Sequence, residues 1–194
     1  THDFRYEAEL CVAAIRRFKC SHFVHDYNGA GALREQFVVQ AGFPLQNVVA
    51  IAYHPSARKN FINHHPATDD HPRDWWSVDK TRSLQMCCEM IKYGYLRFFR
   101  YDFQNSDTPG LVNDWLALVE EKVDMRLGSP VYVISKNPNQ SDDFAQAVNI
   151  GVAALCQMSQ KWPDLAEATH LIIPEDMIPY VSPSRMPDWG DLAW

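Results

Sequence analysis

The stretch SHFVHDYNGAG at residues 21–31 decides the fold. It begins as a short apolar run, partly β-branched, and stops at Asp26 before a turn that contains glycine, which predicts a buried strand ending in a loop. GALREQF at residues 31–37 is typical of a helix, and VVAIAY at residues 48–53 predicts a second buried strand. A strand, a helix and a strand of this length indicate parallel pairing with a right-handed crossover.

The rest of the chain extends this α/β pattern. Apolar residues at helical spacing predict helices, and short apolar runs predict strands. The expected helices cover residues 6–19, 79–93, 111–125 and 141–160, the expected further strands cover residues 95–100 and 131–134, and a turn is expected at residues 137–140. Residues 54–76 lose all periodicity and are expected to form a long loop, with Trp75 and Trp76 as its hydrophobic anchor.

Length and composition bound the class of protein. With 194 residues, 46% of them hydrophobic, the chain suits one globular core. We expect an α/β domain at residues 1–162 and a tail at residues 163–194, where five of the 12 prolines lie. The first residue is Thr1 and not Met, which suggests a domain cut from a longer chain or a processed product.

The net charge of −6 argues against a protein that coats nucleic acid by bulk electrostatics, although it allows a local basic groove. No apolar stretch approaches the roughly 20 residues that span a bilayer, and the first residues do not form a signal peptide. The five cysteines are odd in number and lack C-x-x-C spacing, which favours reduced thiols. Together these features predict a protein of the cytoplasm, without a membrane partner.

The candidate chemistry lies in acids at element ends. Asp26 follows a buried strand, where α/β sheets bind ligands, and Asp142 and Asp143 open a long helix. Carboxylates that converge from separate segments suit Mg²⁺ or Mn²⁺, and a two-ion site of this kind hydrolyses phosphodiesters. The alternative is that Asp26 caps a turn and that Asp142 or Asp143 caps a helix.

The histidines and the DYNGAG stretch suggest two other kinds of site. Six of the eight histidines fall in fifty residues, yet His64 and His65 point two ways in any regular structure, so we do not expect a structural zinc site. His25 is expected to point to the face of its strand opposite Asp26. A third interpretation takes DYNGAG as a phosphate-binding loop of a small-molecule enzyme; it predicts nucleotide binding without a divalent metal.

Taken in order, the segments SHFVHDYNGAGALREQF, VVAIAY, WSVDKTRSLQMCCEMIKYGYLRFF and SDDFAQAVNIGVAAL resemble the C-terminal nuclease domain of the large terminase subunit of tailed bacteriophages. The resemblance covers most of residues 5–160 and implies a ribonuclease H-like central sheet flanked by helices. It implies that Asp26 is the second metal ligand and that Asp143 is the third, with Asp142 as the alternative. Gln146 stands where the family motif usually continues with Asp.

The resemblance also implies a part that this sequence does not contain. The family's first ligand lies on an opening strand ahead of the first helix, and only THDF precedes that helix here, so we expect an N-terminally incomplete domain with weak or no nuclease activity. The whole protein would cut concatemeric viral DNA by two-metal hydrolysis in the host cytoplasm. A catalytically inactive nuclease fold that docks to the portal or the capsid is the alternative.

Partners and DNA-binding residues follow from the same resemblance. Double-stranded DNA, the portal and the small terminase subunit are the expected partners, with two Mg²⁺ or Mn²⁺ ions as cofactors. The basic residues expected to hold the phosphate backbone are Lys80 and Arg82, at a helix start, together with Arg58 and Lys59. Nothing in the chain resembles a phosphate-binding G-x-x-x-x-G-K-[ST] loop, so ATP use is not expected of it.

Overall fold

A computed structural model describes residues 3–54, 61–69, 72–98, 110–126 and 129–163 of the chain. The helices are α1 (Phe4–Phe18), α2 (Gly31–Gln40), α3 (Lys80–Lys92), α4 (Gly110–Leu116) and α5 (Asp143–Ser159), with a 3₁₀ turn, η1, at Leu45–Asn47. The strands are β1 (Phe23–Asp26), β2 (Val48–His54), β3 (Ile62–His65), β4 (Trp75–Asp79), β5 (Leu118–Arg126) and β6 (Ser129–Lys136).

The centre of the molecule is a mixed sheet with strand order β1-β2-β4-β3. β1, β2 and β4 run parallel, and β3 is antiparallel to β4. The predicted parallel pairing of the first two strands is confirmed, with Phe23 opposite Val48 and Asp26 opposite Ile51. The fold is therefore α/β with a mixed sheet flanked by helices.

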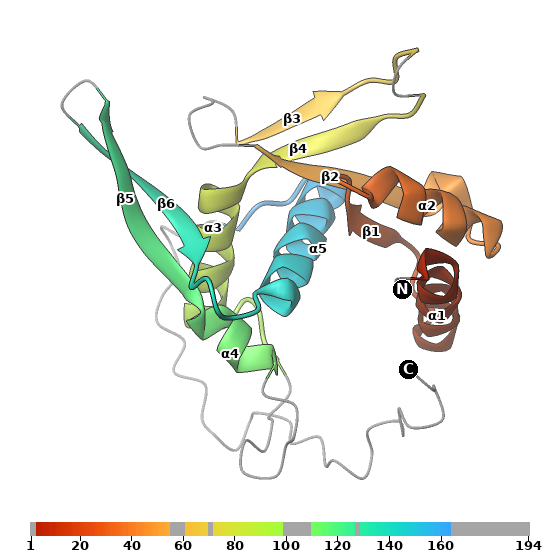
Figure 1. Cartoon of the computed structure of the whole chain (residues 1–194), viewed down its shortest axis with the longest axis horizontal. Coiled ribbons are helices and arrows are strands. Elements are labelled where there is room, and N and C mark those ends of the chain that lie inside the picture. The colour runs from red at the N-terminus through yellow and green to blue at the C-terminus, as the bar shows by residue number, and fades with distance from the viewer. Residues whose placement is uncertain (1–2, 55–60, 70–71, 99–109, 127–128, 164–194) are drawn as a thin grey trace, which may run out of the picture.

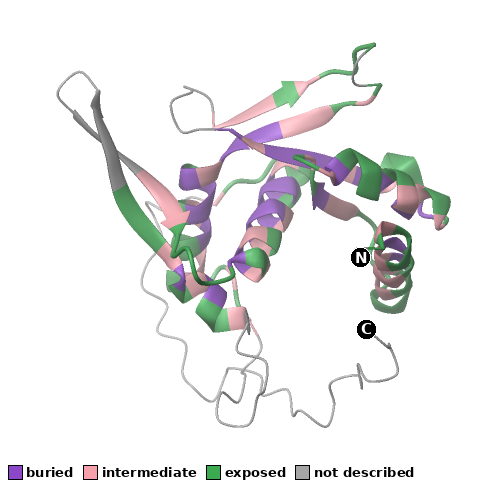
Figure 2. Ribbon diagram, viewed as in Figure 1, coloured by how far each residue is buried: buried purple, intermediate pink, exposed green. Residues whose placement is uncertain are grey.

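The helices form two separate cores with this sheet: α5 packs under one face, and α1 and α2 pack beside β1 and β2 (Figure 1). α5 lies under one face, where Ile51 and Val78 of the sheet pack against Ile150, Ala153 and Ala154. The small alanine side chains let this helix approach the strands closely, and all five residues are buried. Figure 2 shows buried segments in purple along the helix and the strands above it.

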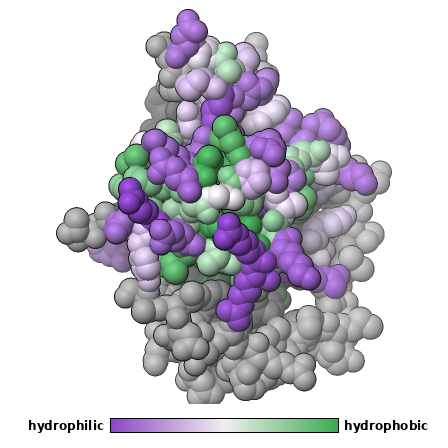
Figure 3. Space-filling view, turned by 90° about the vertical axis from the view of Figure 1, so that its right-hand side faces the viewer, coloured by the Kyte–Doolittle hydropathy of each residue, from purple (hydrophilic) through white to green (hydrophobic). Residues whose placement is uncertain are grey.

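The second core lies beside β1 and β2, where α1 packs on α2. Its buried residues are Ala8, Val12, Val38, Phe43 and Val48. Asp3 begins α1 by accepting hydrogen bonds from the backbone N–H groups of Arg5 and Tyr6, which satisfies two donors that a helix start leaves open. In the space-filling view of this side, hydrophobic side chains gather at the centre and hydrophilic ones surround them (Figure 3).

Most predicted elements are confirmed, and three are corrected. The expected loop at residues 54–76 contains β3 and the start of β4, so Trp75 and Trp76 are strand residues. The helix predicted at residues 111–125 ends at Leu116 and gives way to β5, which pairs with β6 in a separate two-stranded ribbon (Figure 1). Residues 95–98 form no strand, and residues 99–100 of that prediction lie outside the described part of the chain.

The C-terminal tail predicted at residues 163–194 lies outside the described residues from position 164 onward. All five cysteines are free; Cys87 and Cys156 are buried, whereas Cys20 and Cys88 are exposed. Burial raises the pKa of the Cys87 thiol to about 12. Among the described residues, none of the helices has the length and apolar character needed to cross a membrane.

Candidate functional site

The first wall of the candidate site is the end of β1, where side chains alternate between the two faces of the sheet. Val24 and Asp26 face the side of α5, and His25 faces α2, where it bonds Glu35. The expectation that His25 and Asp26 point to opposite faces is therefore confirmed. The Asp26 side chain is exposed, and its Oδ1 accepts a hydrogen bond from the Asn28 N–H at 2.9 Å, so part of its role is to close the turn.

The second wall is the start of α5. Asp142 occupies the N-cap position without capping the helix through its side chain. The cap comes from α4, where Asp114 is buried and its Oδ2 accepts a hydrogen bond from the Phe144 N–H at 2.7 Å. Because Asp114 supplies the cap, the carboxylates of Asp142 and Asp143 are left for other partners.

These walls enclose a cleft of about 480 Å³ at the carboxyl ends of the parallel strands. This is the edge of an α/β sheet where ligands bind. The cleft is lined by Val24, His25, Asp26, Arg34, Tyr53, Lys80, Lys136, Asp142, Asp143, Gln146, Ala147 and Ile150. Residues from β1, α2, β2, α3, β6 and α5 thus meet at one place.

The cleft contains as many cationic as anionic side chains. Lys136 Nζ lies 3.5 Å from Asp142 Oδ1, and Gln146 Nε2 donates to Asp142 Oδ2 at 2.7 Å, so both oxygens of the buried Asp142 have partners. The Lys80 ammonium lies 5.6 Å from the centre of the Tyr53 ring. A cleft that holds both signs of charge can bind a phosphate and a cation together.

Tyr53 lies at the floor of the cleft as a neutral hydrogen-bonding group. Burial raises the pKa of its hydroxyl above the ordinary value; the hydrogen bond from Asn149 opposes the shift, and the negative charges of Asp26 and Asp142 add to it. Asn149 Nδ2 donates to the Tyr53 hydroxyl at 2.9 Å and to Ser83 Oγ at 2.9 Å. This buried amide joins β2, α3 and α5 beneath the site.

The structure brings four of the predicted site residues together. Asp26, Asp142, Asp143 and Lys80 all line the cleft. Arg82 does not line it, because its guanidinium lies 5.2 Å from the centre of the Phe61 ring. Arg58 and Lys59 lie outside the described residues.

The polar cleft residues Arg34, Tyr53 and Lys136 were not predicted from the sequence, and Gln146 was noted only as a departure from the family motif. Gln146 and Tyr53 carried a usable signal: Gln146 lies one helical turn from Asp142, and Tyr53 lies near the end of a predicted parallel strand. Arg34 and Lys136 carried none.

The donor set fits a hard divalent cation only in part. Asp26, Asp142 and Asp143 offer the carboxylate oxygens that Mg²⁺ and Mn²⁺ prefer. Asp143 is exposed, and its Oδ2 accepts a hydrogen bond from Ser141 Oγ at 3.3 Å. Within the described residues, however, no three acidic, histidine or cysteine side chains are close enough to hold a metal together. An ion here would rely on two carboxylates, with water and substrate oxygens completing its coordination.

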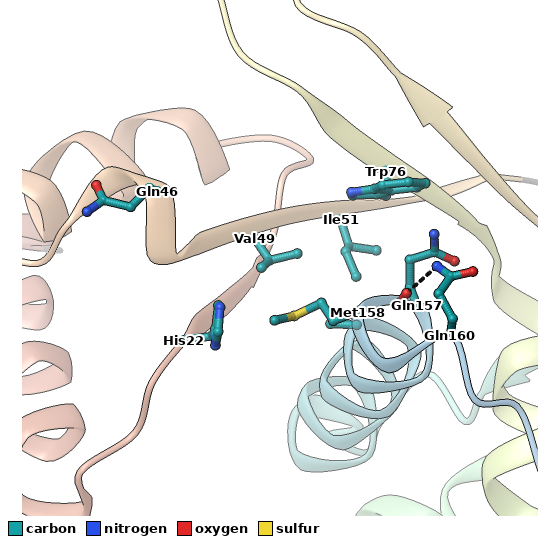
Figure 4. Close-up of a pocket in the computed structure, with 9 residues that line it drawn as sticks. His22, Gln46, Val49, Ile51, Trp76, Gln157, Met158 and Gln160 are labelled. Atoms are coloured by element: carbon teal, nitrogen blue, oxygen red, sulfur yellow. Dashed lines mark hydrogen bonds between the residues drawn. The ribbon is translucent and has the colours of Figure 1, made fainter.

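A second cavity of about 360 Å³ lies at the opposite end of α5 (Figure 4). Its polar groups are uncharged amides and one histidine, set around Val49, Ile51, Met158 and the indole of Trp76. None of the described residues that line it carries a carboxylate, an ammonium or a guanidinium group. The charged cleft is therefore the stronger candidate for chemistry.

Comparisons of this chain with protein-family models, with curated proteins and with solved structures found no match.

Proposed function

We propose that this chain is the metal-dependent nuclease domain of a phage large terminase subunit, with a ribonuclease H-like fold. One observation carries the proposal: Asp26, Asp142 and Asp143, which come from opposite ends of the chain and match the family's acidic motifs, line the same cleft. The parallel strands β1, β2 and β4 flanked by helices are compatible with that fold.

In this proposal the residues divide into two groups. Asp26 and Asp142 or Asp143 would hold Mg²⁺ or Mn²⁺, which when bound activates water and stabilises charge on the phosphodiester. Lys80, Lys136 and Arg34 bind the phosphate backbone as cations. Tyr53 keeps its proton, and its hydroxyl, which donates to the main-chain oxygen of Gln146 at 3.5 Å, would be able to donate to a phosphate oxygen in the cleft.

The first ligand that the resemblance implies has a place to join the site. Among the described strands, β1 forms one edge of the sheet and pairs only with β2. A strand paired along the other side of β1 would bring a carboxylate beside Asp26, as the family's opening strand does by resemblance. We therefore expect weak or no cleavage from this chain alone, since two carboxylates bind metal less tightly than three.

The test is a titration with Mn²⁺ followed by NMR. We expect paramagnetic broadening of resonances around Asp26, Asp142 and Asp143, and its loss in Asp26→Asn. The matched control is Asp69→Asn, because Asp69 is exposed and lies in the loop after β3. Broadening spread evenly over surface carboxylates, or unchanged in Asp26→Asn, would contradict the proposal.

Cleavage of supercoiled plasmid in Mn²⁺ is the second measurement. Slow nicking that disappears in Asp26→Asn and Asp142→Asn is expected. Robust cleavage that is lost in Asp26→Asn would support the family assignment and overturn the expectation of weak activity.

An inactive docking module is the second candidate. It is favoured by exposed apolar side chains on α1, α2 and η1, namely Tyr6, Phe18, Leu33 and Leu45, which are 40% to 56% exposed. Such a module would bind the portal or the capsid and would show no site-specific broadening by Mn²⁺. The same titration therefore separates the two candidates.

A further inference from the structure

His25, which lines the cleft beside Asp26, also belongs to a buried polar network on the α2 side of β1 that the proposed chemistry does not use. His25 Nε2 lies 2.9 Å from Glu35 Oε2, and His25 Nδ1 lies 3.1 Å from the main-chain oxygen of Asp26. His25 is 9% exposed and Glu35 is 8% exposed. Each ring nitrogen of His25 thus faces an oxygen, and a main-chain carbonyl oxygen can only accept.

Arg73 extends this network to a third and a fourth segment. Its guanidinium forms an ion pair with Glu35 and donates from Nη2 to the Val48 carbonyl oxygen at 2.6 Å. The network therefore joins β1, α2, the segment before β4 and the start of β2. Arg73 Nη1 is engaged by this ion pair alone, without a hydrogen bond of its own. Buried polar groups joined in such a network make the local structure more rigid.

The same side of Asp26 is also fixed by close packing against α2. A Cβ atom added at Gly31 would lie 2.2 Å from the Asp26 carbonyl oxygen, so only glycine allows this approach. The Tyr27 N–H donates to the Ile51 carbonyl at 2.7 Å. The backbone at Asp26 is thus held from the α2 side and from β2, while its carboxylate faces the cleft.

We infer that His25 is a positioning residue for Asp26: by bonding its carbonyl oxygen, His25 keeps the Asp26 carboxylate at the wall of the cleft. Functional groups must be held within about 0.5 Å of the productive geometry, which an exposed strand end does not ensure by itself. The inference deepens the proposed function: the part that concerns metal binding rests on the proposal that Asp26 is a metal ligand. The fixed position of the Asp26 side chain does not depend on whether Asp26 binds a metal.

Two substitutions of His25 separate its two hydrogen bonds. In His25→Asn the side-chain amide nitrogen stands in the place of Nδ1 and can still donate to the Asp26 carbonyl. In His25→Gln the amide nitrogen stands in the place of Nε2 and can still reach Glu35. If His25 acts through the Asp26 carbonyl, His25→Asn should keep the Asp26 side chain in place and His25→Gln should not. If His25 only fills space, the two substitutions should have the same effect.

The first readout is hydrogen exchange of the Asn28 amide, which donates to Asp26 Oδ1. Exchange is expected to accelerate about 10-fold in His25→Gln, which loses the bond to the Asp26 carbonyl, and to stay within about 2-fold of wild type in His25→Asn, which keeps it. The buried core amide of Ala153 reports global unfolding in the same samples, so a variant that is simply less stable is recognised. Glu89→Gln, on the exposed side of α3, is a surface control.

The second readout is the dissociation constant for Mn²⁺ alone, measured on the whole chain. Residues that orient a metal ligand typically change metal affinity 10- to 100-fold, and a rise of the dissociation constant in this range is expected for His25→Gln but not for His25→Asn. If wild type binds no Mn²⁺ but the exchange pattern holds, the positioning role stands and the proposed function fails. If Asn28 exchange is the same in His25→Asn and His25→Gln, the positioning role is overturned, whatever the metal does.

Discussion

Two glycines show how a single Cβ atom has opposite effects at different places. Gly31→Ala puts a Cβ atom 2.2 Å from the Asp26 carbonyl oxygen, so α2 must move away from β1. We expect a loss of about 1–3 kcal/mol in the free energy of unfolding, the range for overpacking, with a disturbed Asp26 turn. Urea denaturation and the Asn28 amide shift measure the two effects.

Gly151→Ala is the matched control for that substitution. Gly151 lies inside α5, and nothing lies within 4 Å of an added Cβ atom. Alanine is favoured over glycine in a helix by roughly 0.5–1 kcal/mol, so this variant is expected to be more stable than wild type. Equal destabilisation by both substitutions would contradict the close contact between Gly31 and Asp26.

Glu35 gives the stability of the fold a pH dependence. Burial acts to raise the pKa of this carboxyl, but the hydrogen bonds and charges of His25 and Arg73 outweigh it and hold the pKa below its ordinary value of 4.5. A depressed folded-state pKa stabilises the fold above the unfolded value, and this stabilisation is lost as the pH falls through the folded value. The contribution is therefore complete near pH 7 and declines below about pH 4.5.

Glu35→Gln tests this dependence. Breaking a buried ion pair typically costs about 3–5 kcal/mol, and the low end is expected at pH 7 because glutamine keeps one hydrogen bond. The difference from wild type should narrow between pH 4.5 and pH 3, as measured by urea denaturation at each pH. A difference that stays constant over this range would show that the carboxylate charge does not stabilise the fold.

At the scale of elements, the start of α5 depends on a residue of another helix. Asp114 of α4 is buried and accepts hydrogen bonds from the Phe144 N–H and from Ser141 Oγ. Loss of a helix cap costs about 0.5–2 kcal/mol, so Asp114→Ala is expected to lower the free energy of unfolding by the upper part of that range. Asn113→Ala, at the exposed neighbouring position, is the control and should change stability little.

Asp114 also shows why the acids of α5 were interpretable only in part from the sequence. The pattern SDDF predicted that Asp142 or Asp143 caps the helix or binds metal, and it gave no hint that a third carboxylate supplies the cap. The predicted strand end at Asp26 and the helix start at Asp79 depend on local patterns and are confirmed. The capping role of Asp114 depends on tertiary packing, which no local pattern records.

The ribbon of β5 and β6 illustrates the same limit for whole elements. Leu111, Trp115 and Leu118 have helical spacing, which predicted one long helix, but only the first seven residues from Gly110 are helical. From Leu118 to Arg126 the chain pairs with β6, and pairing with a distant segment overrides local preference. β3 was missed because INHH lacks the apolar character of a buried strand.

At the scale of the whole molecule, the proposed DNA binding depends more on where the charged side chains lie than on the net charge. The chain carries −6, yet Arg34, Lys80 and Lys136 converge on the cleft from α2, α3 and β6. Only Lys80 was predicted from the sequence, because the other two are brought there by the topology. Each such contact with a phosphate releases counterions, so the logarithm of the DNA affinity falls linearly with the logarithm of the salt concentration.

The proposed phosphate contacts can be counted from that slope. In Ca²⁺, used to block cleavage, the slope for duplex DNA should become shallower by about 1 in Lys80→Ala and again in Lys136→Ala, since each contact contributes roughly 0.9. Lys161→Ala is the matched control, because Lys161 is exposed just beyond the far end of α5. If Lys161→Ala changed the slope as much as Lys80→Ala, the DNA would be bound over the surface of the protein and not specifically at the cleft. A DNA affinity insensitive to salt would exclude phosphate contacts by all three cations of the cleft.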